Sequence, residues 1–191
     1  MFHFFAYMAR MRNIVRWSLM RNTFPENIQE HSHQAAMIAH VLAVIRNVRY
    51  QGTLNPDYVA SLAIYHDAGE VITGDLPTPI KHFDREVEEA FEKIETMAIK
   101  KIANMFPEDI QGEYLRYLKP DEASEEWRVV KAADRICAYL KCVEEAKAGN
   151  MEFERARESI LKDIHSLRLP EVDDFMREFA PSFALTLDEL N

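Results

Sequence analysis

Four ionisable side chains, two histidines and two aspartates, fall in apolar surroundings in this sequence. His66 and Asp67 are adjacent and follow the apolar run "LAIY". His31 opens an apolar segment upstream, and Asp134 interrupts another one downstream. Burying an ionisable group is costly unless a partner satisfies it. Neutral imidazoles and carboxylates together form a nitrogen and oxygen ligand set suited to Mn, Co, Fe or Zn, so these four residues predict a metal site.

Helical periodicity turns His31 towards the core. Successive side chains rotate by about 100° around a helix. The apolar stripe that contains His31 also contains Ala35, Ile38, Leu42 and Ile45. His33 and His40 fall on roughly the opposite face, and His82 and His165 lie in unrelated segments. The sequence therefore offers poor candidates for a second metal and favours a single ion.

The same rotation turns the other three residues inward. His66 falls in line with Leu62, and Asp134 falls in line with Val130. Asp67 is about 100° further round than His66, but both can reach one point beyond the end of their helix. Three inward-facing segments thus present imidazole and carboxylate groups.

Each of these residues also has an ordinary structural explanation. A buried histidine such as His31 is often satisfied by a backbone carbonyl. The pair His66-Asp67 can cap a helix end, and Asp134 can pair with its neighbour Arg135. Chance accounts easily for one such residue on a core stripe. Four of them on three helices, in the order His, His-Asp, Asp, indicate a shared site.

Helical patterns account for nearly the whole chain. Helices are predicted at residues 2–17, 31–49, 56–69, 82–105, 107–118, 124–148, 151–166 and 170–179. Two long connections, residues 19–30 and 73–81, are not obviously helical, and binding groups often lie on such loops. The predicted fold class is therefore all-α, a single domain of about seven to eight helices spanning residues 1–191.

The composition narrows the classes of function. The 191 residues carry a formal net charge of -9, whereas a protein that binds long nucleic acid needs a basic face to neutralise phosphates. No apolar stretch approaches the roughly 18 residues of a membrane helix, and no signal peptide is expected. Cys137 and Cys142 lack CxxC spacing. They fit a reduced, cytoplasmic protein.

The order of the four polar residues resembles the metal-binding motif of the HD-domain phosphohydrolases, which are all-helical enzymes. Longer segments resemble the bacterial HD-domain 5′-deoxynucleotidases in particular. These segments are "RWSLMRN" (16–22), "EHSHQAAMIAH" (30–40), "YHDAGEVITGDLPTPIK" (65–81), "KAADRICAYLKCVEEAKAGN" (131–150) and "PSFALTLDEL" (181–190). The resemblance covers almost the whole chain, and its "TGDLPTP" and "RW" segments are more specific than the metal motif.

The resemblance implies a phosphoric monoester hydrolase that removes the phosphate from 2′-deoxyribonucleoside 5′-monophosphates. It implies selectivity against ribonucleotides, little base preference and a homodimer. It also implies one divalent metal ion, Co²⁺, Mn²⁺ or a similar transition metal, held by His31, His66, Asp67 and Asp134. Two alternatives stay open: an HD hydrolase of another phosphorylated nucleotide, and a non-catalytic HD module that binds a metal or a nucleotide.

The resemblance also assigns catalytic roles to Glu70 and Arg16. Glu70 lies three residues after Asp67 and projects from the same side; it would orient or deprotonate the attacking water. Arg16 would hold the phosphate, and Trp17 would form a wall of the sugar pocket. The residues implied to bind substrate are Arg16, Trp17, His31, Asp67, Asp75, Leu76, Pro77, Thr78 and Asp134. The residues alone allow plainer roles: a solvated Arg16, a core anchor at Trp17 and a capping Glu70.

Overall fold

The computed structural model describes residues 1–81 and 83–190, and their regular structure is helical. The α-helices are α1 (Phe4–Met8), α2 (Ile28–Tyr50), α3 (Pro56–Tyr65), α4 (Glu70–Thr73), α5 (Thr78–Lys81), α6 (Arg85–Ala103), α7 (Glu108–Leu118), α8 (Glu125–Lys147), α9 (Glu154–Ser166) and α10 (Pro170–Glu178). Four 3-10 helices, η1 to η4, span Ala9–Asn13, Met151–Phe153, Ala180–Ala184 and Leu187–Leu190. The predicted all-α class is confirmed. None of the described helices is long and apolar enough to cross a bilayer.

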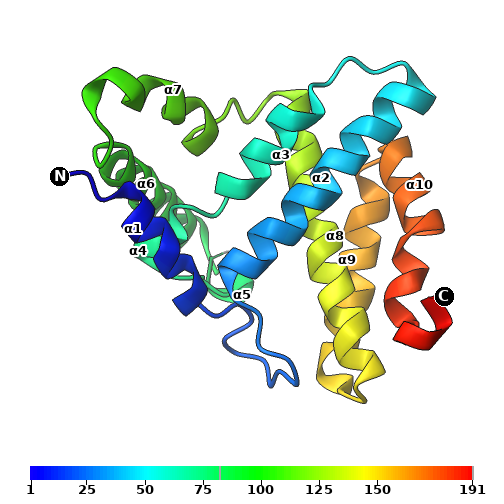
Figure 1. Ribbon diagram of the computed structural model, residues 1–191. Helices are drawn as coiled ribbons and strands as arrows, with labels where there is room; N and C mark the ends of the chain where they lie inside the picture. The colour runs from blue at the N-terminus through cyan, green and yellow to red at the C-terminus, as the bar shows by residue number, and fades with distance from the viewer. Residues whose placement is uncertain (82, 191) are drawn as a thin grey trace.

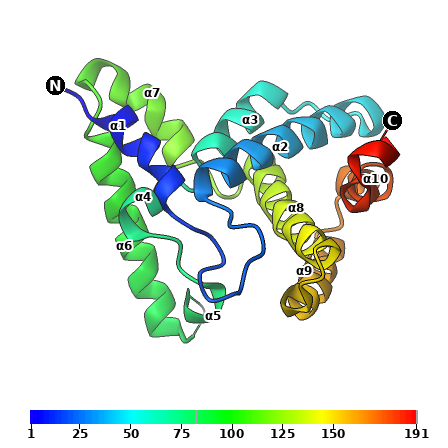
Figure 2. The same cartoon turned by 60° about the horizontal axis from the view of Figure 1, so that its bottom comes forward.

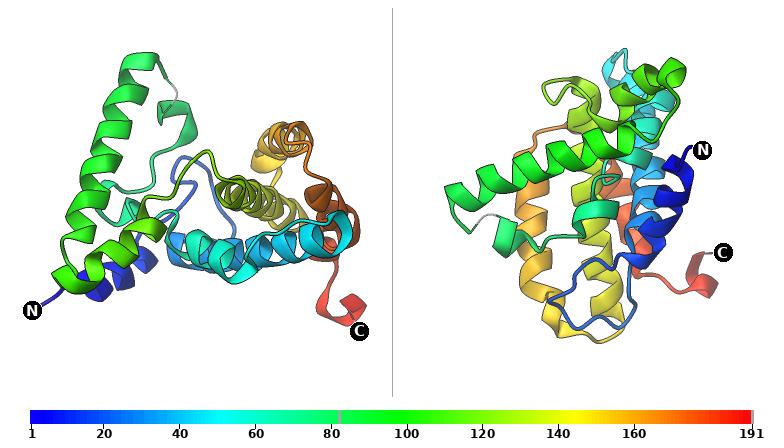
Figure 3. Two further views of the ribbon diagram at one scale, coloured as in Figure 1. Left: turned by 90° about the horizontal axis from the view of Figure 1, so that it is seen from above. Right: turned by 90° about the vertical axis from the view of Figure 1, so that its left-hand side faces the viewer.

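The helices form two groups, which can be followed in Figures 1 and 2. One group packs α2, α3, α8, α9 and α10 around a common core, and the other joins α1, α6 and α7 around Phe4. Figure 3 shows α6 and α10 on opposite sides of the molecule, with α2 and α8 between them. Ala63 belongs to the first core and Ala68 to the second. His66 and Asp67 therefore lie where the two cores meet.

A capping box sets the start of α2, three residues before the predicted position 31. The side chain of Asn27 accepts hydrogen bonds from the backbone N–H groups of Gln29 and Glu30, and Glu30 reaches back to the N–H of Asn27. Such a cap stabilises a helix by about 0.5–2 kcal/mol. The earlier start places His31 in the first turn of α2. Its side chain is fully buried, as are those of Ala35 and Leu42 on the predicted stripe.

The helix predicted at residues 2–17 is wrong beyond residue 13. The chain leaves η1 at Asn13, and Ile14 is extended. Val15 then forms an isolated antiparallel bridge with Asn27. The backbone N–H of Arg16 donates to the carbonyl of Glu26 at 2.9 Å. Arg16 is therefore held by a pairing between segments ten residues apart, which helical periodicity does not report.

The helix predicted at residues 56–69 ends early, at Tyr65. The N–H of Ala68 turns back to the carbonyl of Tyr65 at 2.9 Å, and that of Glu70 to the carbonyl of Asp67 at 3.0 Å. His66 and Asp67 thus lie in a tight turn between α3 and α4. The next connection, predicted as a loop at 73–81, contains the short helix α5. Position 82, where the following helix was predicted to start, lies outside the described residues; α6 begins at Arg85, after its cap.

Candidate active site

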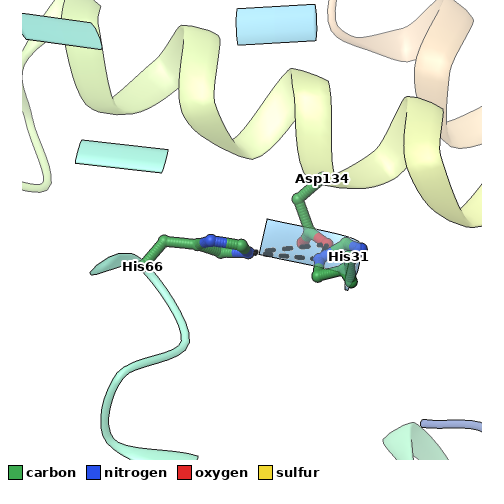
Figure 4. Close-up of side chains that lie close together, drawn as sticks. All are labelled: His31, His66 and Asp134. Carbon is green, nitrogen blue, oxygen red and sulfur yellow. Dashed lines mark hydrogen bonds and ion pairs between the residues drawn. The ribbon is translucent and has the colours of Figure 1, made fainter. Parts of the chain in front are cut away.

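Three of the four predicted ligands converge on one point (Figure 4). His31 comes from α2, His66 from the turn after α3, and Asp134 from α8. The two Nε2 atoms of the histidines are 3.3 Å apart. Asp134 Oδ1 lies 3.1 Å from Nε2 of His31 and 4.0 Å from Nε2 of His66. One donor atom from each residue is therefore within reach of a single ion.

Asp67 brings a fourth donor atom to the same place. Its Oδ2 lies 3.1 Å from Nε2 of His66 and 3.5 Å from Nε2 of His31. Donor atoms bound at about 2.0–2.2 Å to one transition-metal ion are themselves roughly 3–3.5 Å apart. Four of the five donor-to-donor distances, 3.1–3.5 Å, match that requirement, and the fifth, from Asp134 Oδ1 to His66 Nε2, is 4.0 Å. The four residues singled out by pattern thus come together in space.

His66 is oriented as a metal ligand would be. Nδ1 of His66 is 2.7 Å from the carbonyl oxygen of Ala63. A carbonyl only accepts hydrogen bonds, so Nδ1 carries the proton and Nε2 of the neutral ring offers its lone pair to the cluster. Burial lowers the pKa of His66, but the carboxylates of Asp67 and Asp134 more than offset it and raise the pKa. A metal cation at the cluster would compete with a proton for the lone pair of Nε2.

Carboxyl groups outnumber cations around this cluster. The acidic residues that interact electrostatically with Arg16 are Glu26, Asp67, Glu70, Asp75 and Asp134. Among the described residues, Lys131 adds a further cation, 3.6 Å from Asp134. Buried negative charge of this kind requires positive charge nearby. The surplus of carboxyl groups beside two imidazoles therefore fits a divalent metal ion.

The crowding of carboxyl groups shifts their pKa values in opposite directions. Burial would raise the pKa of Asp67, but the charge and hydrogen bond of His66 lower it below its usual range. Burial, followed by the charges of Asp67 and Asp75, raises the pKa of Glu70 to about 9. Oε2 of Glu70 is buried and has no hydrogen-bond partner among the described residues. A cation nearby would favour the ionised form of Glu70, which is the form needed to attract a proton from water.

Arg16 lies against the carboxylates of the cluster rather than in solvent. Its side chain is 13% exposed, with Nη1 at 3.3 Å from Asp67 Oδ2 and Nη2 at 3.8 Å from Asp134 Oδ1. Nε lies 3.2 Å from Glu26 Oε2. The solvated alternative for Arg16 is wrong. Glu26 was missed by pattern because nothing in the 19–30 connection marks it as the partner of an arginine.

Trp17 and Asp75 lie close to Arg16. Trp17 packs edge-to-face on the core residue Phe153, with ring centroids 5.4 Å apart, so the ring is also a core contact. Burial raises the pKa of Asp75, while the charge of Arg16 and a backbone hydrogen bond from Trp17 oppose the rise. The two segments predicted to form one pocket, "RW" and the loop at Asp75, therefore approach each other.

The remaining loop residues are not linked to the cluster by the contacts described. Leu76 and Pro77 are partly buried and lead into α5. The side chains of Thr78 and Pro79 lie outside those the structure describes, so the predicted contact of Thr78 stays a prediction. Of the other histidines, His33 is exposed and His40 pairs with Asp57 at 3.6 Å.

Comparison with solved structures identifies the fold. The fold is similar to that of an HD-domain phosphohydrolase from Listeria innocua, with a TM-score of 0.83 and 22% identity over 95% of this chain and 88% of that one. It is also similar to the cyanophage S-2L HD phosphohydrolase DatZ, bound to dA and one catalytic Zn²⁺ ion. Here the TM-score is 0.68 and the identity 21%, over 95% of this chain and 96% of that one. The fold is that of the HD-domain phosphohydrolases.

Sequence comparison gives the family. Residues 3–183 match the family model described as 5′-deoxynucleotidase YfbR-like. The 5′-deoxynucleotidases of Vibrio parahaemolyticus and Erwinia tasmaniensis are each 48% identical to this chain over 190 residues. The matches cover 99% of this chain and 98% and 96% of those relatives, respectively. The chain belongs to the YfbR-like 5′-deoxynucleotidase family. The predicted family and enzyme class, a phosphoric monoester hydrolase, are confirmed.

Proposed function

We propose that this enzyme hydrolyses 2′-deoxyribonucleoside 5′-monophosphates to deoxynucleosides and phosphate, with selectivity against ribonucleotides and little base preference. One observation carries the proposal. Donor atoms of four side chains lie 3.1–4.0 Å from their neighbours in the cluster, and the guanidinium of Arg16 lies beside them; the four are His31, His66, Asp67 and Asp134. This arrangement supplies the two requirements of phosphomonoester hydrolysis, an activated water and positive charge on the phosphoryl oxygens.

We propose that one divalent transition-metal ion, Co²⁺, Mn²⁺ or a similar ion, is held by His31, His66, Asp67 and Asp134. The donor set and the surplus of carboxyl groups support this assignment, and the Zn²⁺ ion of the similarly folded DatZ agrees with it. When bound, such an ion lowers the pKa of its water towards about 7 and polarises a phosphoryl oxygen. The resting contacts of Arg16 with two of these carboxylates keep the guanidinium close to where the phosphate would bind.

The remaining roles fall to side chains of the chain itself. The guanidinium of Arg16 would hold the phosphate through paired, charge-assisted hydrogen bonds. The carboxylate of Glu70, one residue into α4, would orient the water or take its proton. The buried and unpaired Oε2 atom of Glu70 supports this role, because a buried acceptor needs a partner that the resting protein does not supply.

Selectivity for the deoxy sugar is proposed to come from Trp17 and the loop at Asp75–Thr78. An apolar pocket alone rejects an added hydroxyl by only about 10²-fold. Stricter selectivity needs a rigid wall, because a displacement of about 1 Å from the reacting geometry can cost on the order of 10²-fold. Trp17 packed on Phe153 would be that wall. Asp75 would accept a hydrogen bond from the 3′-hydroxyl.

Replacing Trp17 by alanine should narrow the gap between dAMP and AMP. Removal of the wall admits the 2′-hydroxyl, so AMP turnover should rise relative to that of dAMP, by up to about 10²-fold in the ratio of kcat/KM. Steady-state phosphate release from both nucleotides measures the ratio. Trp127→Ala on α8 is the matched control, because it removes the other tryptophan of the chain. An unchanged ratio in Trp17→Ala would remove Trp17 from the selectivity mechanism.

The proposed function is tested by phosphate release from deoxy- and ribonucleoside monophosphates across several divalent metals. We expect turnover of all four deoxynucleotides and little turnover of their ribonucleotide counterparts. Comparable kcat/KM for dAMP and AMP would contradict deoxy selectivity while leaving the metal-dependent hydrolase in place. Absence of turnover with every metal and every monophosphate would favour a binding module or a different phosphorylated nucleotide as substrate.

We also propose that the enzyme is a cytoplasmic homodimer. The free, buried cysteines Cys137 and Cys142 support a reducing compartment. Apolar side chains that stay exposed, Phe83 before α6 and Met97 within it, at 77% and 70%, support an association surface. Light scattering should give twice the chain mass of 22.3 kDa. The mass of a single chain at micromolar concentration would contradict the dimer.

A further inference from the structure

A buried ion pair on α8 lies outside the metal cluster. Lys141 and Glu145 are one helical turn apart and are 4% and 0% exposed. The ammonium of Lys141 donates a hydrogen bond to the carboxylate of Glu145. Pairs at this spacing normally lie on the surface of a helix, where they contribute little to stability. The burial of this pair calls for a different explanation.

The pair is covered by the loop that follows Trp17. Glu145 accepts hydrogen bonds from the backbone N–H groups of Thr23, at 2.9 Å, and Phe24, at 3.1 Å. Lys141 donates to the backbone carbonyl of Phe24. An irregular loop has backbone groups that no helix or sheet satisfies, and buried ones need side-chain partners. The ion pair supplies those partners.

Asn150 completes the attachment from the end of α8. Its Nδ2 donates to the carbonyl oxygen of Arg21 and to Oε2 of Glu145, both at 2.7 Å. Burial would raise the pKa of Glu145, but the hydrogen bonds from Lys141, the loop and Asn150 lower it to about 2. The carboxylate form of Glu145 is thus stabilised by four donors, Lys141, Asn150 and the backbone N–H groups of Thr23 and Phe24. We call Lys141, Glu145 and Asn150 the loop clamp.

The near end of the clamped loop carries Trp17, the proposed wall of the sugar pocket. Trp17 has a φ of +59°, a left-handed conformation that is rare outside glycine and costly for a bulky residue. Such a conformation persists only where the surroundings impose it. The ring of Trp17 packs on the ring of Phe153. The ammonium of Lys141 lies 5.6 Å from the centroid of the Phe153 ring. The clamp and Trp17 thus share one packing partner.

We propose that Lys141, Glu145 and Asn150 are positioning residues for substrate selectivity, which hold the loop from Trp17 to Phe24 so that the indole stays rigid. The inference rests on the role of Trp17 in the proposed function. It predicts that loosening the clamp weakens discrimination against the 2′-hydroxyl without removing the metal. A purely structural role predicts a loss of stability alone.

The test compares Glu145→Gln and the milder Asn150→Ala with a matched control, Glu171→Gln. Glu171 on α10 is also 0% exposed and paired with an arginine, Arg46, at 3.3 Å, but it contacts no part of the loop in the interactions described. All variants are made in a Trp127→Phe background, so that Trp17 is the sole tryptophan. Acrylamide quenching of its fluorescence reports loop mobility independently of activity, and metal content is measured in parallel.

Both clamp variants should show increased quenching of Trp17 and an unchanged metal content. The ratio of kcat/KM for dAMP over AMP should narrow by about tenfold, within the cost of a roughly 1 Å displacement. Glu171→Gln should alter neither quenching nor the ratio. Wild-type quenching in folded Glu145→Gln and Asn150→Ala proteins would overturn the clamp. Increased quenching with a wild-type ratio would support the clamp and contradict the role of Trp17 in selectivity.

Discussion

Alanine at Asp67 or at His31 should abolish metal binding and phosphate release together. Asp67 Oδ2 lies within 3.5 Å of both imidazoles and of Arg16, so its loss removes a proposed ligand and a partner of the proposed phosphate-binding group at once. His31 is fully buried in the first turn of α2, and its Nε2 lies 3.3 Å from that of His66 and 3.1 Å from Asp134 Oδ1. Changes to residues that only support metal ligands typically cost about 10–100-fold. The loss of a ligand itself should exceed that range.

Elemental analysis of the purified variants and phosphate release from dAMP measure the two effects. The matched control is the surface pair of His40 and Asp57, which has the same residue types 3.6 Å apart but an exposed setting. Alanine at either control position should leave metal content and turnover at wild-type levels. Full activity of the wild-type enzyme after chelation, with no metal detected, would contradict the metal-dependent mechanism.

Substitution of Glu70 should separate chemistry from metal binding. Glu70 is not needed to complete the proposed four-residue ligand set, and its Oε2 makes no hydrogen bond to any residue that the structure describes. Glu70→Ala and the isosteric Glu70→Gln should therefore keep their metal and their affinity for dAMP. Turnover should fall by roughly 10²–10⁴-fold, the contribution of a well-placed general acid or base.

Single-turnover rates, nucleotide binding and metal content distinguish the possible roles of Glu70. Glu92→Gln, an exposed position on α6, makes the same chemical change away from the site. It should behave as wild type in all three measurements. If Glu70→Gln loses its metal, Glu70 is a ligand and the assigned role is wrong. If it keeps wild-type turnover, the carboxylate acts neither as a base nor in orienting the water.

The inward orientation of the metal-site residues follows from local sequence. His31 lies on a stripe whose other members, among them Ala35 and Leu42, are fully buried as predicted. Val130, on the stripe of Asp134, is buried in the same way. Helical rotation per residue depends only on backbone geometry, so a pattern of apolar positions reports the buried face directly. The residues proposed as metal ligands were therefore accessible from sequence as inward-facing positions.

The sequence pointed to Arg16 as a candidate residue but did not predict where its side chain lies. Periodicity extended the first helix to residue 17, whereas the chain leaves the helix after Asn13. The extended course of residues 14–16 is imposed by the bridge between Val15 and Asn27 and by the bond from Arg16 to Glu26. These partners lie across a loop, and local propensity carries no record of them. The guanidinium reaches the two carboxylates of the cluster only because of that pairing.

The loop clamp also separates what sequence pattern predicts from what tertiary contacts decide. In the sequence, Lys141 and Glu145 form an i,i+4 pair typical of a solvated helix face. In the fold they are buried by residues 21–24, more than a hundred positions away along the chain. Sequence pattern alone thus determined the all-α class, the inward faces of the helices and which polar residues face inward as proposed metal ligands, because these follow from helical geometry. Tertiary structure decided where Arg16 and Trp17 lie and which charges become buried, because those outcomes depend on contacts between segments remote in sequence.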